Sequence, residues 1–264
     1  MNQIINGLSV NTFGDDKNQP IIFVHGFPYD YSMWENQINL LKENYYCVTY
    51  DVRGLGRSFV GDGQYTMEFF VDDLFAVISE LKLHKPVLCG LSMGGYIALR
   101  AVERNQNTFS SVILLDTRSD ADDNAGKLKR AAGINRINIE GLEKFAEAFV
   151  TNCFADETPI EQKDMFFTTL HKSYQHNPVG VKGCIIAIMS RTDTSNFLSH
   201  IKIPTLVICG SFDKLTPPHV MRSMAEKIPD SEFAIVPRAG HMTPLENPDN
   251  VNDLISGFLK RKAR

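Results

Sequence analysis

Short apolar runs rich in β-branched residues recur along this chain and alternate with segments of helical periodicity. The runs cover residues 21–24, 45–50, 87–89, 112–115, 205–209 and 233–236. Between most of them lie segments such as residues 67–81, where apolar side chains repeat at helical spacing. Strands that alternate with helices build a parallel sheet covered on both faces. The sequence therefore predicts an α/β fold with a doubly wound, mostly parallel sheet.

One interval interrupts this alternation. Residues 118–196 contain no convincing strand, and we expect helices there near residues 128–136, 142–150, 159–173 and 179–189. The strand pattern then resumes at about residue 203. A chain of 264 residues can form one α/β core of this kind. We expect residues 1–117 and 197–264 to form that core and residues 118–196 to form a helical lid inserted into it.

Charge and hydropathy argue against nucleic-acid binding and against a membrane span. The chain has 27 Lys and Arg against 31 Asp and Glu, and its basic cluster is limited to residues 260–262, so nucleic-acid binding is not expected. Residues 1–14 alternate apolar and polar side chains, which favours a strand over a signal peptide. No apolar run approaches the roughly 18 residues of a membrane span. We expect a cytoplasmic protein whose partner is a small molecule, with no membrane contact.

The cysteines predict neither disulfides nor a metal site. There are five, an odd number, and Cys47, Cys89 and Cys209 lie inside apolar runs where a small buried thiol is ordinary. The chain contains no CxxC or HExxH spacing. We expect reduced, structural cysteines, no metal and no cofactor.

The segment GLSMGG, residues 90–95, carries the first candidate for chemistry. Ser92 has a glycine two residues before it and another two residues after it, between a strand-like and a helix-like stretch. In that context G-x-S-x-G is a tight, strained turn that lifts a serine hydroxyl clear of the backbone. The alternative is a Gly-rich turn whose serine only caps a helix. The position of the motif favours Ser92 as a nucleophile.

A serine nucleophile needs a base, usually a histidine held by a carboxylate. Asp213 and His241 each follow a strand-like run, and the chain order Ser92, Asp213, His241 is the one associated with this elbow. Asp116 also ends a strand and competes with Asp213 for the role of the acid. Asp213 could otherwise be a turn or cap carboxylate, and His241 a loop histidine of purely structural role.

Acyl transfer also needs hydrogen-bond donors for the developing oxyanion, and backbone amides are already oriented for this. The segment VHGFP follows the strand-like run 21–24, so the N–H groups of Phe27 and Met93 are predicted to converge on one oxygen. We expect His25 to be structural and to pack under this loop. The segment DVRGLGRS, residues 51–58, has glycines suited to a tight loop, and its charges are expected to brace that loop.

Together the segments HGFPYDYSMW, DVRGLGRS, GLSMGG, GSFDKLTPP and GHMTPLENP resemble the α/β-hydrolase superfamily. The pattern is similar to the branch of 3-oxoadipate enol-lactonase-like carboxylesterases and haloperoxidase-like perhydrolases. This resemblance implies a triad of Ser92, Asp213 and His241, with Phe27 and Met93 as oxyanion donors. Haloalkane dehalogenases and epoxide hydrolases carry aspartate at the position of the serine, which argues against both. Lys214 stands where many relatives have a second acid.

The predicted function is hydrolysis of small carboxylic esters or lactones through an acyl-enzyme. The same residues would serve a hydrolase that cleaves C–C bonds of ring-cleavage products, or a receptor-like protein that binds a small ligand with little turnover. Arg118 could hold a substrate carboxylate, as an enol-lactonase would require, or pair with Asp116 or with the acidic residues that follow it. The lid should supply an apolar pocket for uncharged acyl groups of short to medium length, from among Phe145, Phe149, Phe154, Met165, Phe166, Phe167 and Met189.

Overall fold

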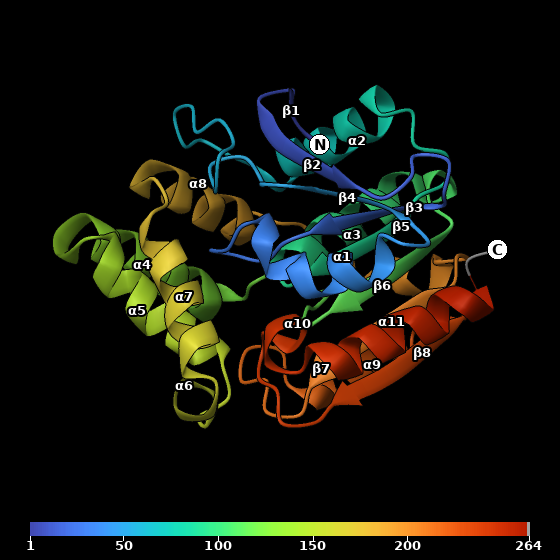
Figure 1. Cartoon of the computed structure of the whole chain (residues 1–264). Helices are drawn as coiled ribbons and strands as arrows, with labels where there is room; N and C mark the ends of the chain where they lie inside the picture. The colour runs from blue at the N-terminus through green and yellow to red at the C-terminus, as the bar shows by residue number, and fades with distance from the viewer. Residues whose placement is uncertain (263–264) are drawn as a thin grey trace.

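The computed structural model describes residues 1–262 and contains an eight-stranded sheet with the order β1-β2-β4-β3-β5-β6-β7-β8 (Figure 1). The strands are β1 (Asn2–Ile5), β2 (Leu8–Phe13), β3 (Pro20–Val24), β4 (Tyr46–Tyr50), β5 (Val87–Leu91), β6 (Ser111–Leu115), β7 (Thr205–Gly210) and β8 (Ser231–Val236). Strands β3 to β8 run parallel to one another, and β2 is antiparallel to both β1 and β4. The predicted α/β fold with a mostly parallel sheet is confirmed. The alternating N-terminal segment forms a hairpin of two strands.

Alternate side chains of each central strand enter separate cores on the two faces of the sheet. In β6, Val112 and Leu114 pack with α2 (Met67–Glu80), α3 (Met93–Asn105) and α9 (Pro218–Ala225). Ile113 and Leu115 pack on the other face with α1 (Glu35–Leu41) and α11 (Pro248–Lys262). A strand buried on both faces needs apolar residues at every position, which explains its continuous apolar run.

Five helices follow β6 and precede β7, and they gather beside one edge of the sheet (Figure 1). They are α4 (Asn124–Glu140), α5 (Leu142–Cys153), α6 (Thr158–Glu161), α7 (Lys163–Tyr174) and α8 (Pro178–Met189). The short helix η3 (Ser195–His200) leads from them to β7. We call residues 118–196 the lid, and its separation from a core of residues 1–117 and 197–264 stays a prediction.

Two helix boundaries in the lid differ from the expectation. The single helix expected over residues 159–173 is wrong, because the backbone turns out of the helical region at Gln162 (φ −123°, ψ 46°) and divides α6 from α7. The helix expected over residues 128–136 is longer at both ends. The helix begins at Asn124 because the Asp123 carboxylate caps it, with Oδ1 accepting the Gly126 N–H at an N–O distance of 2.7 Å. No helix in residues 1–262 has both the length and the apolar character to cross a bilayer.

Candidate active site

The turn between β5 and α3 holds Ser92 in a strained conformation. Its backbone has φ 52° and ψ −113°, a region that residues other than glycine rarely occupy. The flanking glycines leave room for this turn, since a Cβ on Gly90 would lie 2.3 Å from the Gly94 carbonyl oxygen. A Cβ on Gly94 would lie 2.1 Å from the carbonyl oxygen of Val24. The sequence pattern therefore reflects two close backbone approaches at the carboxyl ends of β3 and β5.

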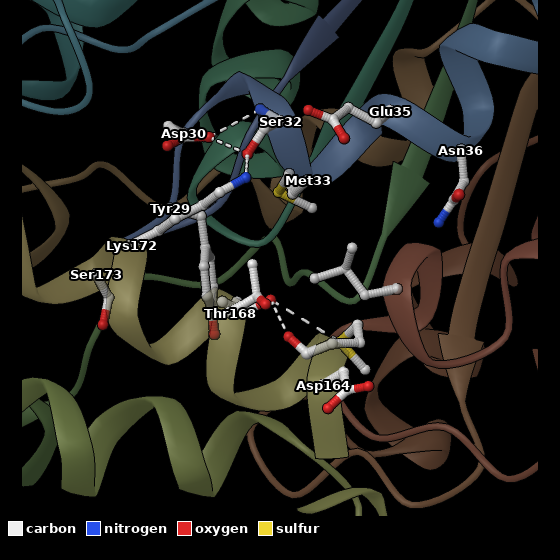
Figure 2. A pocket seen from close by; sticks show the side chains of 13 residues that line it. Tyr29, Asp30, Ser32, Met33, Glu35, Asn36, Asp164, Thr168, Lys172 and Ser173 are labelled. Atoms are coloured by element: carbon white, nitrogen blue, oxygen red, sulfur yellow. Dashed lines mark hydrogen bonds between the residues drawn. The ribbon is translucent and has the colours of Figure 1, made fainter. Parts of the chain in front are cut away.

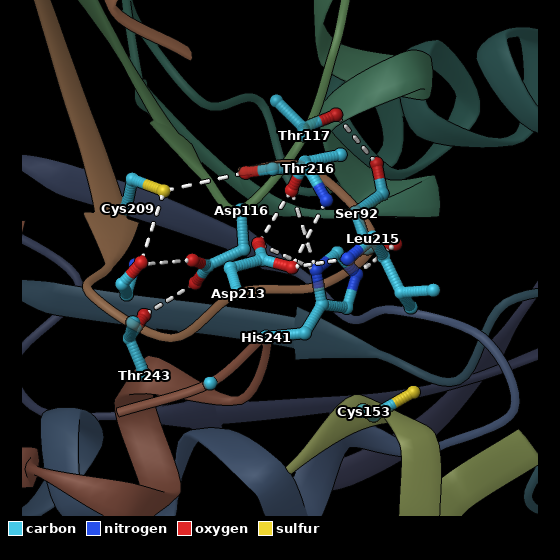
Figure 3. A network of polar contacts seen from close by, with 12 residues as sticks. Ser92, Asp116, Thr117, Cys153, Cys209, Asp213, Leu215, Thr216, His241 and Thr243 are labelled. Carbon is cyan, nitrogen blue, oxygen red and sulfur yellow. Dashed lines mark hydrogen bonds and ion pairs between the residues drawn. The ribbon is translucent and has the colours of Figure 1, made fainter. Parts of the chain in front are cut away.

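Ser92, His241 and Asp213 form one continuous chain of hydrogen bonds (Figure 3). His241 Nε2 lies 2.8 Å from Ser92 Oγ, and His241 Nδ1 lies 2.8 Å from Asp213 Oδ2. Each of the three residues follows a parallel strand, namely β5, β8 and β7. The structure thus brings together the three side chains predicted to act as nucleophile, base and acid, in the geometry that serine activation requires.

Asp213 is held as a carboxylate by the loop that follows it. Its Oδ1 accepts the N–H groups of Leu215 at 2.8 Å and Thr216 at 2.9 Å, and its Oδ2 accepts the Thr216 hydroxyl. Burial alone would raise the pKa of Asp213, but the neighbouring His241 and the hydrogen bonds from His241 and Thr216 lower it to about 2. Sequence reasoning overlooked Thr216, although its position three residues after Asp213 is the spacing of a capped turn.

Asp116, the competing acid, is not hydrogen-bonded to His241. One of its carboxyl oxygens accepts the Gly210 N–H at 2.9 Å, and the other shares a hydrogen bond with the Thr243 hydroxyl. Complete burial, and then the charge of Asp213, raise the pKa of Asp116 well above its usual range. Asp116 therefore links the ends of β6 and β7 to the loop after His241 (Figure 3).

Of the two predicted oxyanion donors, Met93 follows Ser92 directly, and Phe27 lines the same cavity as Ser92. Met93 is the first residue of α3, where amides have no partner within the helix. The Phe27 amide lies in the loop after β3, and within residues 1–262 it donates to no other protein group. His25 is buried beneath this loop: its Nδ1 lies 2.8 Å from the Gly26 carbonyl oxygen, and its Nε2 accepts the Val52 N–H at 2.8 Å. These contacts fit the structural role expected for His25.

Asp51 braces its own loop, residues 51–58, as expected, and also ties it to the segment after Phe27, whose loop of residues 25–30 we call the oxyanion loop. The Asp51 carboxylate accepts the Tyr31 N–H at 2.9 Å through one oxygen and the Arg57 N–H at 2.8 Å through the other. The Ser58 hydroxyl donates to the Asp51 carbonyl oxygen. This carboxylate therefore joins two loops that both lie at carboxyl ends of strands.

A cavity of about 250 Å³ opens in front of Ser92 and His241. Its apolar wall contains Phe27 and lid residues Phe145 and Phe149, whose ring centroids lie 6.3 and 5.3 Å from that of Phe27. Other expected lid residues are used differently. Phe154 and Phe166 are buried in the core on the other face of the sheet, and Phe167 is half exposed.

Arg118 lines this cavity, but its guanidinium pairs with Asp120 through two nitrogens. It does not pair with Asp116, which was one of the open alternatives. Lys214, where relatives often carry an acid, lies 2.6 Å from Asp156 and so connects the Asp213 loop to the lid.

Part of the cavity lining, which we call the cationic wall, carries excess positive charge. Lys129 and Arg130 of α4 line the cavity together with Asp122. Arg130 and Arg191 both pair with this one carboxylate. Within residues 1–262, Lys129 forms no ion pair. The cavity therefore joins an apolar wall to a wall with excess positive charge.

One set of side chains has the composition of a metal site. The ligand atoms of Asp116, Cys209 and Asp213 all lie within 4.8 Å of one another. Both carboxylates are engaged in the hydrogen bonds described above, and burial raises the pKa of the Cys209 thiol, which favours the protonated form. A metal would have to displace the contact between His241 and Asp213, so this set fits a hydrogen-bonded network better. The five cysteines are all free and buried.

Comparison with known proteins agrees with this arrangement. Residues 19–248 match the family described as alpha/beta hydrolase fold. The chain belongs to this family. The structure of a thermophilic esterase from Thermogutta terrifontis superposes on this α/β-hydrolase with a TM-score of 0.95, at 32% identity and over 100% of both chains.

Curated relatives of this α/β-hydrolase span nearly its whole length. A 3-oxoadipate enol-lactonase 1 from Acinetobacter baylyi is 28% identical over 96% of this chain and 93% of its own. A putative non-heme chloroperoxidase from Synechocystis is 26% identical over 97% of each chain. The resemblance drawn from the motifs is thereby confirmed. The family and its esterase and lactonase relatives support a carboxylic ester hydrolase, which confirms the predicted enzyme class.

Proposed function

We propose that this α/β-hydrolase cleaves small carboxylic esters or lactones through an acyl-enzyme on Ser92. The observation that carries the proposal is the hydrogen-bonded chain from Ser92 through His241 to Asp213, with 2.8 Å at each step, at the wall of the cavity. The 3-oxoadipate enol-lactonase and the esterase among the relatives agree with this chemistry.

The reaction divides into acylation and deacylation. His241 Nε2 takes the proton of Ser92 Oγ as this oxygen attacks the carbonyl carbon, and the amides of Phe27 and Met93 donate to the resulting oxyanion. His241 then returns the proton to the leaving alkoxide, and an acyl-enzyme remains. In deacylation His241 takes a proton from water, whose oxygen attacks the acyl carbon, and the serine leaves protonated with release of the acid. Asp213 keeps the imidazole in the required tautomer throughout.

A preference for anionic esters or lactones is a second candidate, favoured by the cationic wall of the cavity. Lys129 lacks an ion-pair partner within residues 1–262 and belongs to the cationic wall. The Thermogutta terrifontis esterase was solved with malate bound, and malate is a dicarboxylate. A substrate with its scissile carbonyl at Ser92 and a carboxylate near Lys129 would match both walls. Arg118 is a weaker partner for such a carboxylate because Asp120 already neutralises it.

Two activity measurements test the proposal. Wild-type protein should turn over p-nitrophenyl butyrate and take up one fluorophosphonate label at Ser92, and Ser92→Ala should lose both. Ser199→Ala, a change at an exposed serine, is the matched control and should keep both. An active protein whose peptide map carries the label elsewhere would overturn the assignment. Cleavage of a vinylogous diketone with no ester turnover would favour the C–C hydrolase, and ligand binding without turnover would favour the receptor-like alternative.

A further inference from the structure

His176 enters the active-site region from the lid, just after α7 ends. Its side chain is buried, with 7% of the residue exposed. Its Nε2 lies 3.0 Å from the Pro28 carbonyl oxygen, and its Nδ1 accepts the Gly56 N–H at 3.1 Å. A carbonyl needs a donor and an amide needs an acceptor, so the neutral ring with the proton on Nε2 satisfies both contacts.

Both partners of this ring belong to loops that shape the candidate active site. Pro28 follows Phe27, whose amide is the proposed oxyanion donor, and no helix or strand fixes the backbone there. Gly56 belongs to the loop of residues 51–58 described above, which the Asp51 carboxylate ties to Tyr31. The imidazole therefore bridges the oxyanion loop to its neighbour from the lid side.

A second contact joins the lid to the same loop a few residues later. Lys172 of α7 donates from Nζ to the Ser32 hydroxyl at 2.6 Å, and Ser32 in turn donates its N–H to Asp30 at 2.8 Å (Figure 2). These residues border a cleft of about 320 Å³ between α7 and the segment that follows the oxyanion loop. Water can therefore enter beside Lys172, whereas the His176 contacts are shielded.

We infer that His176 is a positioning residue through which the lid holds the Phe27 amide in its place beside Ser92. Its hydrogen bond to the Pro28 carbonyl restrains the peptide unit between Pro28 and Tyr29, which lies just after Phe27 in the loop, and its contact with Gly56 fixes the ring itself. Removing the ring lets the loop move away from Ser92. This inference rests on the proposed function, because it assigns the loop a role in oxyanion stabilisation.

A positioning role and a space-filling role predict different kinetic effects. Loss of a positioning residue lowers kcat, whereas loss of a residue that only fills space does not. The oxyanion exists only after attack by the serine, so a displaced amide weakens binding of the transition state and leaves binding of the intact substrate unchanged. Removal of an oxyanion donor costs about 10²- to 10³-fold in kcat elsewhere. Displacement of a donor that is still present should cost less, roughly tenfold to a hundredfold.

The experiment compares His176→Ala, His176→Gln and the control His171→Ala on p-nitrophenyl butyrate. His171 lies in the last turn of α7, just before His176, is exposed, and forms no side-chain hydrogen bond within residues 1–262. His176→Ala should lower kcat by roughly tenfold to a hundredfold with KM within about twofold. It should weaken inhibition by a trifluoromethyl ketone, whose adduct carries the oxyanion, by the same factor. His176→Gln, which retains a donor for Pro28, should recover most of the loss, and His171→Ala should match wild type.

Several outcomes would overturn the inference. Unchanged kcat and inhibitor affinity in a folded His176→Ala variant would show that the ring only fills space, and so would a rise in KM alone. If the alanine variant does not fold, His176→Leu, which fills similar space but offers no donor to Pro28, takes its place, and wild-type kcat and inhibitor affinity in that variant contradict the inference. A wild-type protein without ester turnover would instead refute the proposed function, and the two failures are thereby distinguishable.

Discussion

Asp116 and Asp213 are buried carboxyl groups at the ends of neighbouring strands, and their surroundings shift their pKa values in opposite directions. Asp213 faces His241 and three donors from its own loop, and its pKa falls to about 2. Asp116 has a single backbone donor and the Thr243 hydroxyl, and burial raises its pKa. In the proposed mechanism, the imidazolium of His241 is therefore stabilised by the negative charge of Asp213.

This difference predicts unequal effects of two amide substitutions. Asp213→Asn should lower kcat by on the order of 10⁴, because an amide favours the wrong tautomer of His241 and supplies no charge. Asp116→Asn should stay within about tenfold of wild type, because an amide resembles the neutral acid in size and polarity and still offers an oxygen to Gly210. Steady-state kinetics on p-nitrophenyl acetate check both variants. A reversed order of the two losses would identify Asp116 as the acid.

His176 should also make stability depend on pH. Burial lowers the pKa of His176 from 6.5 to about 4, although the charge of Asp30 opposes this. The unfolded chain then binds more protons than the folded chain between these values, so stability is complete above pH 6.5 and declines as the pH falls toward 4.

The expected contribution of His176 to that decline is about 2 kcal/mol between pH 7 and pH 5. Urea unfolding at the two pH values measures it, with His176→Gln as the comparison because glutamine does not titrate. The variant should lose less stability than wild type over this interval. Equal losses in the two proteins would mean that the histidine titrates normally in the folded state.

At the scale of elements, the helix α4 shapes the cavity with small and basic side chains. Gly126, Lys129, Arg130 and Gly133 all line the cavity and recur at the spacing of one helical face. A glycine inside a helix costs about 1 kcal/mol relative to alanine, so the two glycines here leave space at the expense of helix stability. Phe145 of α5 lies beside this space, since a Cβ on Gly133 would be 3.0 Å from its ring.

Gly133→Ala should therefore stabilise the protein and narrow its substrate range. The added methyl group gains helix propensity, up to about 1 kcal/mol, and the Phe145 ring can shift slightly toward the cavity. The ratio of kcat/KM for p-nitrophenyl hexanoate to that for the acetate should fall. Urea unfolding and ester kinetics give the two readouts. The control Ala132→Gly, at an exposed site of the same helix, should lower stability without altering the ratio of kcat/KM values. An unchanged ratio in Gly133→Ala would show that the acyl chain does not bind beside Gly133.

Local sequence signals predicted the strands and the residues at their ends, but not the contacts made by the lid. Ser92, Asp213 and His241 follow apolar runs that can be recognised directly, because a strand buried on both faces tolerates few polar residues. His176 follows no such run, and its partners at Pro28 and Gly56 lie more than a hundred residues earlier in the chain. The break at Gln162 was missed because residues 161–164 are all polar, and such a run is equally compatible with a continuous exposed helical turn and with a break.

At the scale of the whole molecule, the cavity lies where the lid meets the carboxyl ends of the strands. Phe27, Ser92 and His241 come from the sheet side, whereas Phe145, Phe149 and Lys129 come from the lid. The cavity is therefore lined by both segments, whereas the groups proposed to react come from the sheet side alone. Under the proposed function, changes in the lid should alter substrate preference more than they alter the reaction itself.

The volume of this cavity limits the length of the acyl chain that can be buried. At about 250 Å³ it falls below the usual range of sites for drug-sized ligands, about 300 to 1,000 Å³. Each methylene buried against the phenylalanine wall should contribute about 0.8 kcal/mol, or roughly fourfold in kcat/KM, until the cavity is full. Along p-nitrophenyl esters from acetate to decanoate, kcat/KM should rise and then fall, with its maximum at or below about octanoate. A rate that still climbs at palmitate, with activation at a lipid interface, would require the lid to open and would indicate a lipase.

The cationic wall predicts a preference for an anionic acyl group, so kcat/KM should be higher for the p-nitrophenyl monoester of succinate than for the butyrate. Lys129→Met should abolish this preference, whereas the control Lys127→Met should keep it. A preference that survives in Lys129→Met would show that the cationic wall does not recognise the substrate.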